Sequence, residues 1–341
     1  MKAKNISGQA PGGKRTRLAE VLPLATPFVV QIFPTYACNF KCNYCIFSID
    51  KEQRSFISDK INMDFGLYQK CIDDFTNFPE KIKVLRFVGI GEPLLHKRIA
   101  EMIGYAADKK VAETIELLTN AALLSPATAD ALIAAGLSRL VVSIQGTSSQ
   151  RYKEISDVDL DLKQLIDNLK YFFSHKGQIQ TYIKIVDTAL NDQNDEEKFY
   201  DLFGNCCDTI AVEHTVPIHS GIDYDKVFKT KDHKLTQFGL PVAEIKVCPQ
   251  PFFTMQINPD GKVVPCYSFE YPEIIGDCSQ EAANEIWNSS SFQSFRRRML
   301  DGAEKTAASC RDCSIIKYRI FPEDDLNHDA ERLKKLFEPC E

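Results

Sequence analysis

The sequence predicts an α/β protein in which a parallel sheet is followed by a smaller C-terminal part. Between residues 28 and 214, six short apolar segments alternate with amphipathic segments of helical period. Such alternation is typical of a parallel sheet built from βαβ units. The periodicity fits a partial barrel and an open sheet equally. In both folds the functional groups gather at the carboxyl ends of the strands.

The six predicted strands are short and apolar, as expected of strands buried between helices. The first is FVVQIF at residues 28–33, which is rich in β-branched and aromatic residues. The others cover residues 83–90, 114–120, 139–145, 180–187 and 209–214.

Five helices are expected between these strands, at residues 64–78, 98–110, 125–136, 162–177 and 195–206. The third has the clearest ends, because Ser125 is a good N-cap, Pro126 suits the first turn and Gly136 stops the helix. Gly177 closes the fourth helix in the same way.

The regular alternation of apolar and helical segments ends near residue 220. Residues 220–239 are polar and irregular, which indicates a linker, and the turn Asn258-Pro259-Asp260-Gly261 joins two apolar runs as a hairpin would. Residues 285–300 predict one or two short helices. The expected parts are a flexible arm (1–25), the parallel-sheet part (26–220), a linker (221–245) and the C-terminal part (246–341).

The composition is that of an ordinary globular protein, with 44% hydrophobic residues, 26% charged residues and a formal net charge of -6. A negative net charge gives no reason to expect nucleic acid or an anionic membrane as a partner. The N-terminal residues lack the apolar core of a signal peptide, and no segment could span a bilayer. We therefore expect a cytoplasmic protein, whose 12 cysteines are metal ligands, redox groups or buried apolar residues rather than disulfides.

Three of these cysteines, Cys38, Cys42 and Cys45, stand close together directly after the first predicted strand. This spacing would arise by accident in only about 1 in 70 chains of this composition. A structural zinc site requires four ligands, whereas an iron–sulfur cubane held by three thiolates keeps one iron open to a further ligand. The motif therefore predicts an iron–sulfur centre with an open iron that takes part in chemistry.

With this motif, residues 28–215 resemble the radical S-adenosylmethionine (SAM) superfamily. The three cysteines match its cluster loop, and Tyr44 matches the aromatic residue that usually precedes the third cysteine. The resemblance implies a partial (β/α)6 barrel, a 4Fe–4S cluster, SAM, and an electron donor of the flavodoxin or ferredoxin type. It also implies reductive cleavage of SAM to methionine and a 5'-deoxyadenosyl radical, which abstracts hydrogen from a substrate.

The resemblance also indicates which residues bind SAM. GIGEP, from Gly89 to Pro93, ends the second strand and is similar to the family's glycine-glutamate-proline loop, in which the glutamate holds the SAM amino group. Glycines let a backbone approach closely, and a carboxylate pairs with an ammonium. In the family, aspartate is commoner than glutamine at the place of Gln145. The expected SAM contacts are Tyr44, Gly89, Gly91, Glu92, Pro93, Thr119, Asn120, Ser143 and Gln145.

A second set of cysteines lies in the C-terminal part: Cys248, Cys266, Cys310 and Cys313. It resembles the auxiliary-cluster domains of the family, Twitch and SPASM, and the half-sized Twitch form fits better because few cysteines follow Cys313. The resemblance implies a β-hairpin and helix domain that holds a second 4Fe–4S cluster. Zinc, or a site that uses Cys278 or Cys340, remains an alternative.

Charged residues at the ends of the last strands are candidates for contact with the substrate. Lys184 is costly inside a strand unless it meets a charge or solvent, so it either faces the chamber or pairs with Glu213. Arg86 precedes the expected SAM loop and either reaches an anion in the chamber or is paired. These three are the predicted catalytic residues, and Tyr182, Asp187, His214 and His219 lie near them.

The favoured function is that of a radical SAM oxidoreductase acting on a small polyhydroxylated substrate, such as a sugar, a cyclitol or a nucleotide-linked molecule. The auxiliary cluster would accept an electron. The alternatives are a maturase that modifies a ribosomally synthesised peptide and a redox-neutral epimerase or lyase.

Overall fold

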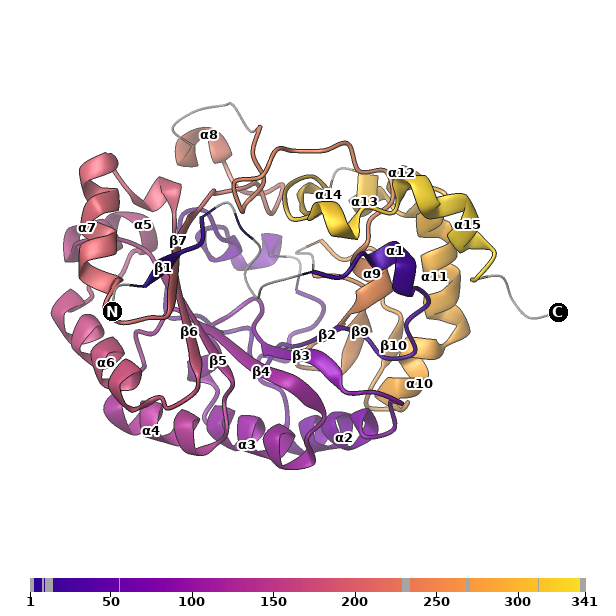
Figure 1. Ribbon diagram of the computed structural model, residues 1–341, viewed down its shortest axis with the longest axis horizontal. Coiled ribbons are helices and arrows are strands. Elements are labelled where there is room, and N and C mark those ends of the chain that lie inside the picture. Colours follow the sequence, from indigo (N-terminus) through magenta and orange to yellow (C-terminus); the bar gives the residue numbers. More distant parts are fainter. Residues whose placement is uncertain are drawn as a thin grey trace.

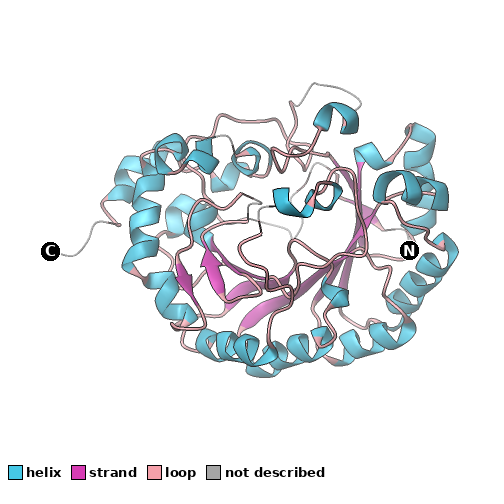
Figure 2. Ribbon diagram, turned by 180° about the vertical axis from the view of Figure 1, so that it is seen from behind, coloured by secondary structure: helices cyan, strands magenta, loops and turns pink. Residues whose placement is uncertain are grey.

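In the computed structural model, a curved sheet is covered by helices on its outer face (Figures 1 and 2). The structure describes residues 3–7, 9, 15–54, 56–228, 234–267, 270–311 and 313–337. Within them the sheet has the strand order β1-β7-β6-β5-β4-β3-β2-β8-β9-β10. The strands are β1 (Lys4–Asn5), β2 (Val29–Ile32), β3 (Ile82–Phe87), β4 (Ala112–Thr119), β5 (Arg139–Ile144), β6 (Gln180–Val186), β7 (Thr209–Glu213), β8 (Thr254–Ile257), β9 (Lys262–Val264) and β10 (Gly276–Asp277).

The six predicted strands are β2 to β7, and each is parallel to the next. The prediction of an α/β fold with a partial barrel is confirmed, since the sheet curves and its helices lie along the convex side (Figure 2). The parallel arrangement gathers the loops that follow these strands at one end of the barrel.

The five predicted helices are all present, with ends that differ from the expected ones by a few residues. They are α2 (Phe65–Phe75), α3 (Ile99–Lys109), α4 (Pro126–Ala134), α6 (Leu162–His175) and α7 (Gln193–Phe203). Ser125 caps α4 as expected, with its hydroxyl accepting a hydrogen bond from the Thr128 amide at 3.1 Å. The same region also holds α5 (Ser149–Ser156), which the sequence analysis did not predict.

Side chains alternate across the strands, and this alternation builds both the core and the chamber. Leu85 and Phe87 on β3 are fully buried in the main hydrophobic core. Each buried side chain of this size contributes about 1.5–3 kcal/mol. Arg86, between them in the sequence, lies on the opposite face of the sheet and therefore in the barrel interior.

The C-terminal hairpin extends the barrel sheet rather than forming a sheet of its own. Its first strand, β8, is parallel to β2, with Val30 opposite Met255, and β9 and β10 continue the sheet by antiparallel pairing. Gly261 in the hairpin turn has a φ of +92°, as its predicted left-handed position requires. A single hydrophobic core contains residues of both the barrel and the C-terminal helices, for example Ile72 and Trp287.

The remaining helices belong to the N-terminal segment, the linker and the C-terminal part. They are α1 (Leu18–Val21), α8 (Tyr224–Val227), α9 (Gln250–Phe253), α10 (Ala283–Asn288), α11 (Ser290–Leu300), α12 (Ala303–Thr306), α13 (Ala308–Arg311), α14 (Ser314–Tyr318) and α15 (Ala330–Lys334). No helix among the described residues is both long and apolar enough to cross a membrane.

The N-terminal arm contacts the rest of the protein at several places among its described residues. Lys4–Asn5 pairs with β7 as an additional parallel strand, and α1 buries Leu18 and Ala19. Further along, the Leu24 carbonyl accepts a hydrogen bond from the Trp287 indole at 2.9 Å. Backbone pairing and buried apolar side chains hold these parts of the arm. The Gly, Lys and Arg content of the segment did not indicate these contacts.

The segment expected to be a linker also makes specific contacts where the structure describes it. The Gln237 carbonyl accepts from the His214 amide, and the Gln237 amide donates to the Tyr318 carbonyl, both at 2.8 Å. The segment therefore ties the end of β7 to the end of α14 over the mouth of the barrel.

Candidate active site

The loop that carries the first three cysteines follows β2 and is held by α5. The Lys41 amide donates to the Ser156 carbonyl at 2.9 Å, and the Asn43 amide donates to the Ile155 carbonyl at 2.8 Å. The Cys42 sulfur lies 3.2 Å from the Ser156 hydroxyl. Because α5 offers its last carbonyls to this loop, the loop keeps a fixed shape around Cys42.

The three thiols lie in surroundings that disfavour a lone thiolate. Burial, together with the neighbouring thiols, raises the pKa of Cys42 to about 12, and burial likewise raises that of Cys38 to about 12. Burial also raises the pKa of Cys45. A bound cationic centre would offset this cost, because a coordinating thiol is deprotonated by the metal.

Three thiols on one loop match the ligand set of a cubane that keeps one iron open. A tetrahedral zinc site would need its sulfurs about 2.3 Å from one point. A cubane binds each thiolate at a different iron, so its ligands can stand further apart.

The GIGEP loop packs directly on the start of the cysteine loop. A Cβ at Gly91, whose φ is +146°, would lie 2.2 Å from the Thr35 carbonyl oxygen. A Cβ at Gly89, whose φ is +139°, would lie 2.4 Å from the Phe33 ring. The two glycines thus serve the contact between two loops of the protein itself, in addition to any approach to a ligand.

Glu92 at the end of this loop is a buried carboxylate held by neutral donors. It accepts from the Thr119 hydroxyl at 2.6 Å, the Asn120 amide at 2.7 Å and the Leu94 amide at 2.9 Å. Burial raises its pKa, and no described Lys, Arg or His forms an ion pair with it. An incoming ammonium would supply the missing counter-charge, so the site fits the amino group of SAM.

The other expected SAM contacts lie around the same loops. Pro93 is buried and begins a short turn directly after Glu92. The Asn120 side chain donates to Asn39 at 2.8 Å, which links the end of β4 to the cysteine loop. The Gln145 amide nitrogen lies 3.1 Å from the Ser143 hydroxyl and 3.4 Å from the Tyr44 hydroxyl, while its buried carbonyl oxygen has no protein partner. An acceptor without a partner suits a site for a polar ligand.

The four C-terminal cysteines surround one cavity. Cys248, Cys266, Cys310 and Cys313 line a small cavity together with apolar side chains such as Phe295 and Met299. Burial raises the pKa of the Cys310 thiol to about 12, and burial together with the nearby Cys313 thiol raises that of Cys266 well above its ordinary value. Four thiols around one apolar cavity form a donor set that fits a fully ligated cluster.

The sequence offers two further cysteines, Cys278 and Cys340, as ligands of this site. Cys278 lies against Cys71 on α2 and does not line the cavity, so the structure gives it no place among the ligands. Cys340 falls outside the described residues.

Lys184 and Glu213 form an ion pair inside the barrel. The Lys184 ammonium lies 2.7 Å from Glu213 Oε2. The side-chain amide of Gln237 donates to the same oxygen at 2.7 Å, and the Tyr182 hydroxyl donates to Oε1 at 2.9 Å. Burial raises the pKa of Glu213, but the Lys184 ammonium and these hydrogen bonds bring it below its ordinary value. Glu213 is therefore a carboxylate at neutral pH. Nothing in the sequence around Gln237 indicated this contact.

Arg86, the third predicted catalytic residue, is not part of this pair. Its Nε donates to Glu116 on the neighbouring strand, and Arg139 binds the other oxygen of Glu116 at 2.9 Å. Arg86 therefore lies beside a buried carboxylate, while its side chain keeps 34% of its surface exposed.

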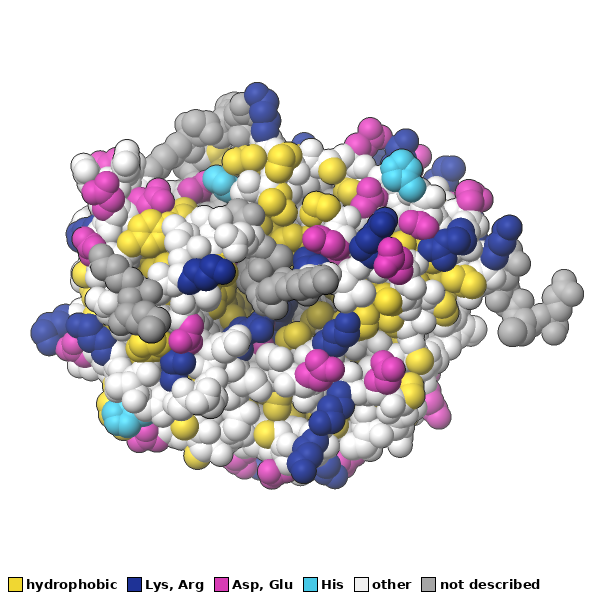
Figure 3. All heavy atoms as spheres, in the orientation of Figure 1, with side chains coloured by type: hydrophobic (Ala, Val, Ile, Leu, Met, Phe, Trp, Pro, Cys, Tyr) yellow, Lys and Arg dark blue, Asp and Glu magenta, His cyan; other side chains and the backbone are white. Residues whose placement is uncertain are grey.

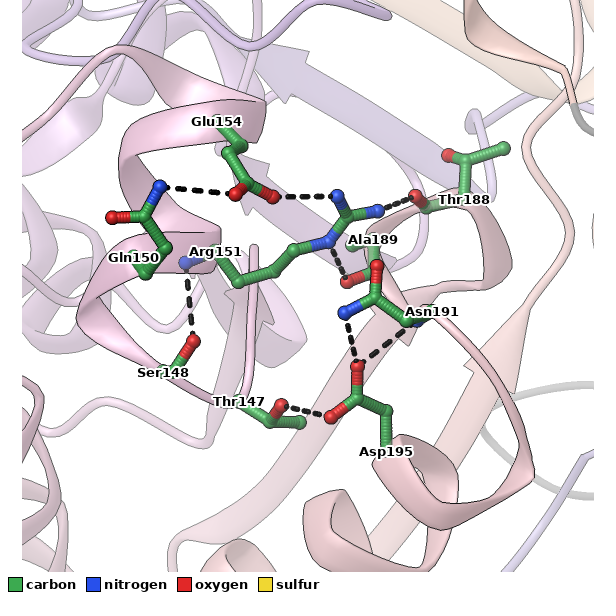
Figure 4. A network of polar contacts seen from close by, with 9 residues as sticks. All are labelled: Thr147, Ser148, Gln150, Arg151, Glu154, Thr188, Ala189, Asn191 and Asp195. Carbon is green, nitrogen blue, oxygen red and sulfur yellow. Dashed lines mark hydrogen bonds and ion pairs between the residues drawn. The ribbon is translucent and has the colours of Figure 1, made fainter.

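A second acid–base pair stands at the mouth of the barrel. His214 Nδ1 lies 2.9 Å from Asp187 Oδ2, and the hydrogen bond raises the pKa of His214 above its ordinary value. The loop that carries Asp187 is fixed by Arg151 of α5, which donates to the Thr188 carbonyl at 2.6 Å and the Ala189 carbonyl at 2.9 Å (Figure 4). Helix α5 thus positions both this loop and the cysteine loop.

Comparison with known protein families gives two matches. The model of the radical SAM superfamily matches residues 32–203, which is half of the chain. The model of an iron–sulfur cluster-binding domain, SPASM, matches residues 248–314, the region of the four C-terminal cysteines.

Two curated proteins are similar over most of the chain. A tungsten-containing aldehyde ferredoxin oxidoreductase cofactor-modifying protein of Pyrococcus furiosus is 25% identical, with 82% of this chain and 85% of the relative covered. A GTP 3',8-cyclase of Clostridium perfringens is 24% identical, with 75% of this chain and 76% of the relative covered.

Solved structures share the fold at lower identity. SuiB of Streptococcus suis, bound to the precursor peptide SuiA, has a TM-score of 0.61 at 16% identity, with 80% of this chain and 67% of SuiB covered. BtrN, in complex with AdoMet (SAM) and 2-DOIA, has a TM-score of 0.53 at 17% identity, with 86% of this chain and 95% of BtrN covered. These neighbours bind a peptide in one case and a small molecule in the other.

Proposed function

Because the chain belongs to the radical SAM superfamily and carries a C-terminal iron–sulfur cluster-binding domain, we propose that it is an oxidoreductase of a small polyhydroxylated substrate. The substrate class comprises sugars, cyclitols and nucleotide-linked molecules. The observation that carries the proposal is the second set of four thiols around one cavity, because a fully ligated cluster there is suited to accept an electron.

Different residues of the first site would bind the cluster and SAM. Cys38, Cys42 and Cys45 would ligate the first cluster, and Glu92 would hold the SAM ammonium. When bound, the cluster and SAM supply the radical that takes hydrogen from a carbon atom of the substrate.

The oxidation of an alcohol to a carbonyl removes one hydrogen atom, one proton and one electron. The radical would take the hydrogen atom, and a cluster held by the four C-terminal cysteines would accept the electron. The proton requires a base near the reacting hydroxyl. We assign this part to the Lys184–Glu213 pair, because Glu213 is ionised at neutral pH and the Lys184 ammonium has donors beyond the one that Glu213 uses.

The resemblance to BtrN, which binds a small molecule, and to a cyclase whose name contains GTP supports a small substrate. The resemblance to SuiB with its bound precursor peptide favours the second candidate, a peptide maturase. The electron donor in either case is proposed to be of the flavodoxin or ferredoxin type.

The first test separates SAM cleavage from net oxidation. The chain would be reconstituted with iron and sulfide without oxygen and then reduced, and 5'-deoxyadenosine would be measured with and without candidate sugars, cyclitols, nucleotides and peptides. Cys42→Ala should abolish 5'-deoxyadenosine formation and lower the iron content by about four atoms, since one cubane is lost. Cys310→Ala should retain some cleavage but lose oxidised product.

The matched control is Cys207→Ala, which removes a buried thiol remote from both sets and should keep both activities. No 5'-deoxyadenosine from the wild-type protein would refute the proposal. Full product formation by Cys310→Ala would refute the role of the second cluster as electron acceptor.

A further inference from the structure

On the inward faces of these barrel strands, cations outnumber carboxylates, whereas the chain as a whole carries a negative net charge. Along neighbouring strands, Arg86 on β3, Glu116 on β4 and Arg139 on β5 stand opposite one another in register. Further along the barrel, Lys184 stands against Glu213. These strands therefore direct three cations and two carboxylates inward, although the chain as a whole carries a net charge of -6.

A fourth cation enters from the C-terminal part. Arg319 follows α14, and its guanidinium carbon lies 5.6 Å from the centre of the Tyr267 ring. Its Nε is buried without a hydrogen-bond partner, and no described carboxylate pairs with it. An arginine donor without a partner costs free energy unless a ligand accepts from it.

Arg319 is held at the mouth of the barrel by the chain that crosses it. The carbonyl of Tyr318, its neighbour in the sequence, accepts from the Gln237 amide, and the Gln237 carbonyl accepts from the His214 amide. The side chain of Gln237 in turn binds Glu213 at 2.7 Å. Arg319 is thus connected through two backbone hydrogen bonds to the strand end that carries the proposed base.

The apolar cluster around Tyr267 places Arg319 and Arg86 beside the same space as the first cluster loop. Val88 belongs to the apolar cluster against which Tyr267 and Leu118 pack. Val88 and Leu118 are the next inward-facing residues after Arg86 and Glu116, which stand opposite each other in register. The Tyr267 ring also packs edge-on to Phe33 at 6.1 Å, in the apolar cluster that contains Cys38 and Cys45.

Arg86 keeps free donors in this space. Only its Nε is used by Glu116, and neither terminal nitrogen has a partner among the described residues. In the view of Figure 3, Lys and Arg side chains are visible at and within the central hollow of the face. Two guanidinium groups and one aromatic ring therefore border the space in front of the first three cysteines.

From this arrangement we propose that Arg319 and Arg86 form an anion-binding subsite, which holds a phosphate or carboxylate group of the small-molecule substrate. The planar guanidinium fork matches both groups. The inference rests on the proposed function and narrows it, because it selects nucleotide-linked, phosphorylated or acidic substrates over neutral sugars and cyclitols.

The test measures binding rather than turnover. The reconstituted full chain, saturated with SAM so that the cofactor's own carboxylate site is filled, would be titrated calorimetrically without oxygen. One titration uses inorganic pyrophosphate and the other succinate. Arg319→Gln should weaken binding of the preferred anion by about tenfold to a hundredfold, because charge-assisted contacts are lost. Arg319→Lys should recover part of the affinity, since it restores the charge without the fork.

Arg298→Gln is the matched control, because Arg298 pairs with Glu273 on the exposed side of α11 and should not affect binding. Tighter binding of pyrophosphate would identify a phosphate subsite, and tighter binding of succinate a carboxylate subsite. Wild-type affinity in a correctly folded Arg319→Gln protein, or no binding of either anion to the wild type, would overturn the inference. Failure of the proposed function would appear separately, as absence of 5'-deoxyadenosine from the wild type.

Discussion

Gly91 illustrates how a single residue type is required by the path of the backbone. Its φ of +146° lies in a region that residues with a side chain rarely adopt. An added Cβ would also lie 2.2 Å from the Thr35 carbonyl oxygen. Gly91→Ala should therefore lower the free energy of unfolding by about 1–3 kcal/mol or more and separate the two loops.

Chemical denaturation of the two variants Gly91→Ala and Gly104→Ala would check this expectation. Gly104 lies in α3, where the nearest atom to an added Cβ is 3.9 Å away. Alanine there should stabilise the protein by about 0.5–1 kcal/mol. Equal stability of the two variants would contradict the argument.

The His214–Asp187 pair should make stability depend on pH. The pKa of His214 is raised above 6.5, so its contribution is fully present below pH 6.5 and is lost as pH rises through the raised value. The pKa of Asp187 is below 3.8, so its contribution is present above pH 3.8 and is lost as pH falls through the lowered value. The pair is therefore most stabilising between these limits.

Thermal unfolding from pH 5.5 to 9 would test this. The midpoint difference between wild type and His214→Gln should be largest near pH 5.5–6.5 and should shrink toward pH 9. His175→Gln serves as the control, because His175 contacts Ser174 and Tyr171 rather than a carboxylate. A difference for His214→Gln that does not change with pH would exclude the ion pair.

At the scale of elements, α5 is the part that connects the two functional loops. Its last carbonyls hold the cysteine loop, and Arg151 in its first half holds the loop after β6 (Figure 4). Gly146 just before α5 has no room for a side chain, since a Cβ would lie 2.8 Å from the Cβ of Arg151. The short helix is thus fixed at both ends.

Arg151→Met should release the loop at residues 187–190. Amide hydrogen exchange there should become at least tenfold faster, because each hydrogen bond from a charged donor is worth about 1.5–3 kcal/mol. The pKa of His214, followed by NMR, should fall toward 6.5 as Asp187 becomes less fixed. Arg98→Met, which breaks an exposed pair with Glu101, should leave exchange at 187–190 unchanged. Unchanged exchange in Arg151→Met would mean that other contacts hold the loop.

For the whole molecule, the continuous sheet makes the barrel dependent on the C-terminal part. Without β8, the central strand β2 would become an edge with unpaired backbone groups. The Trp287 side chain, fully buried in the shared core, would also be lost. The barrel and the C-terminal part are therefore expected to fold together.

A chain that ends at residue 245 should accordingly lose cooperative unfolding and bind a dye specific for exposed apolar surface. A chain that lacks residues 1–7 is the control. It loses the two-residue strand β1 and the buried side chain of Ile6, and it should still unfold in one cooperative step. Cooperative unfolding of the chain ending at 245 would show that the barrel is an independent domain.

The sequence by itself determined the six parallel strands, the helices between them and the cysteine motif. These features are local: alternation of apolar residues, helix caps such as Ser125, and spacing within one loop are all encoded by neighbouring residues. The hairpin turn at Gly261 was predictable for the same reason. Helix α5 was missed because its sequence is polar and short, and its stability comes from tertiary contacts.

Only the tertiary structure decided which distant residues meet. The pairing of β8 with β2, the contact of Gln237 with Glu213 and the approach of Arg319 to Tyr267 all join residues separated by long stretches of chain. The sequence showed that Arg86 and Lys184 needed partners, and the fold selected Glu116 and Glu213. The physical reason is that a buried charge must be paired, but the partner depends on how neighbouring strands align, which no local pattern contains.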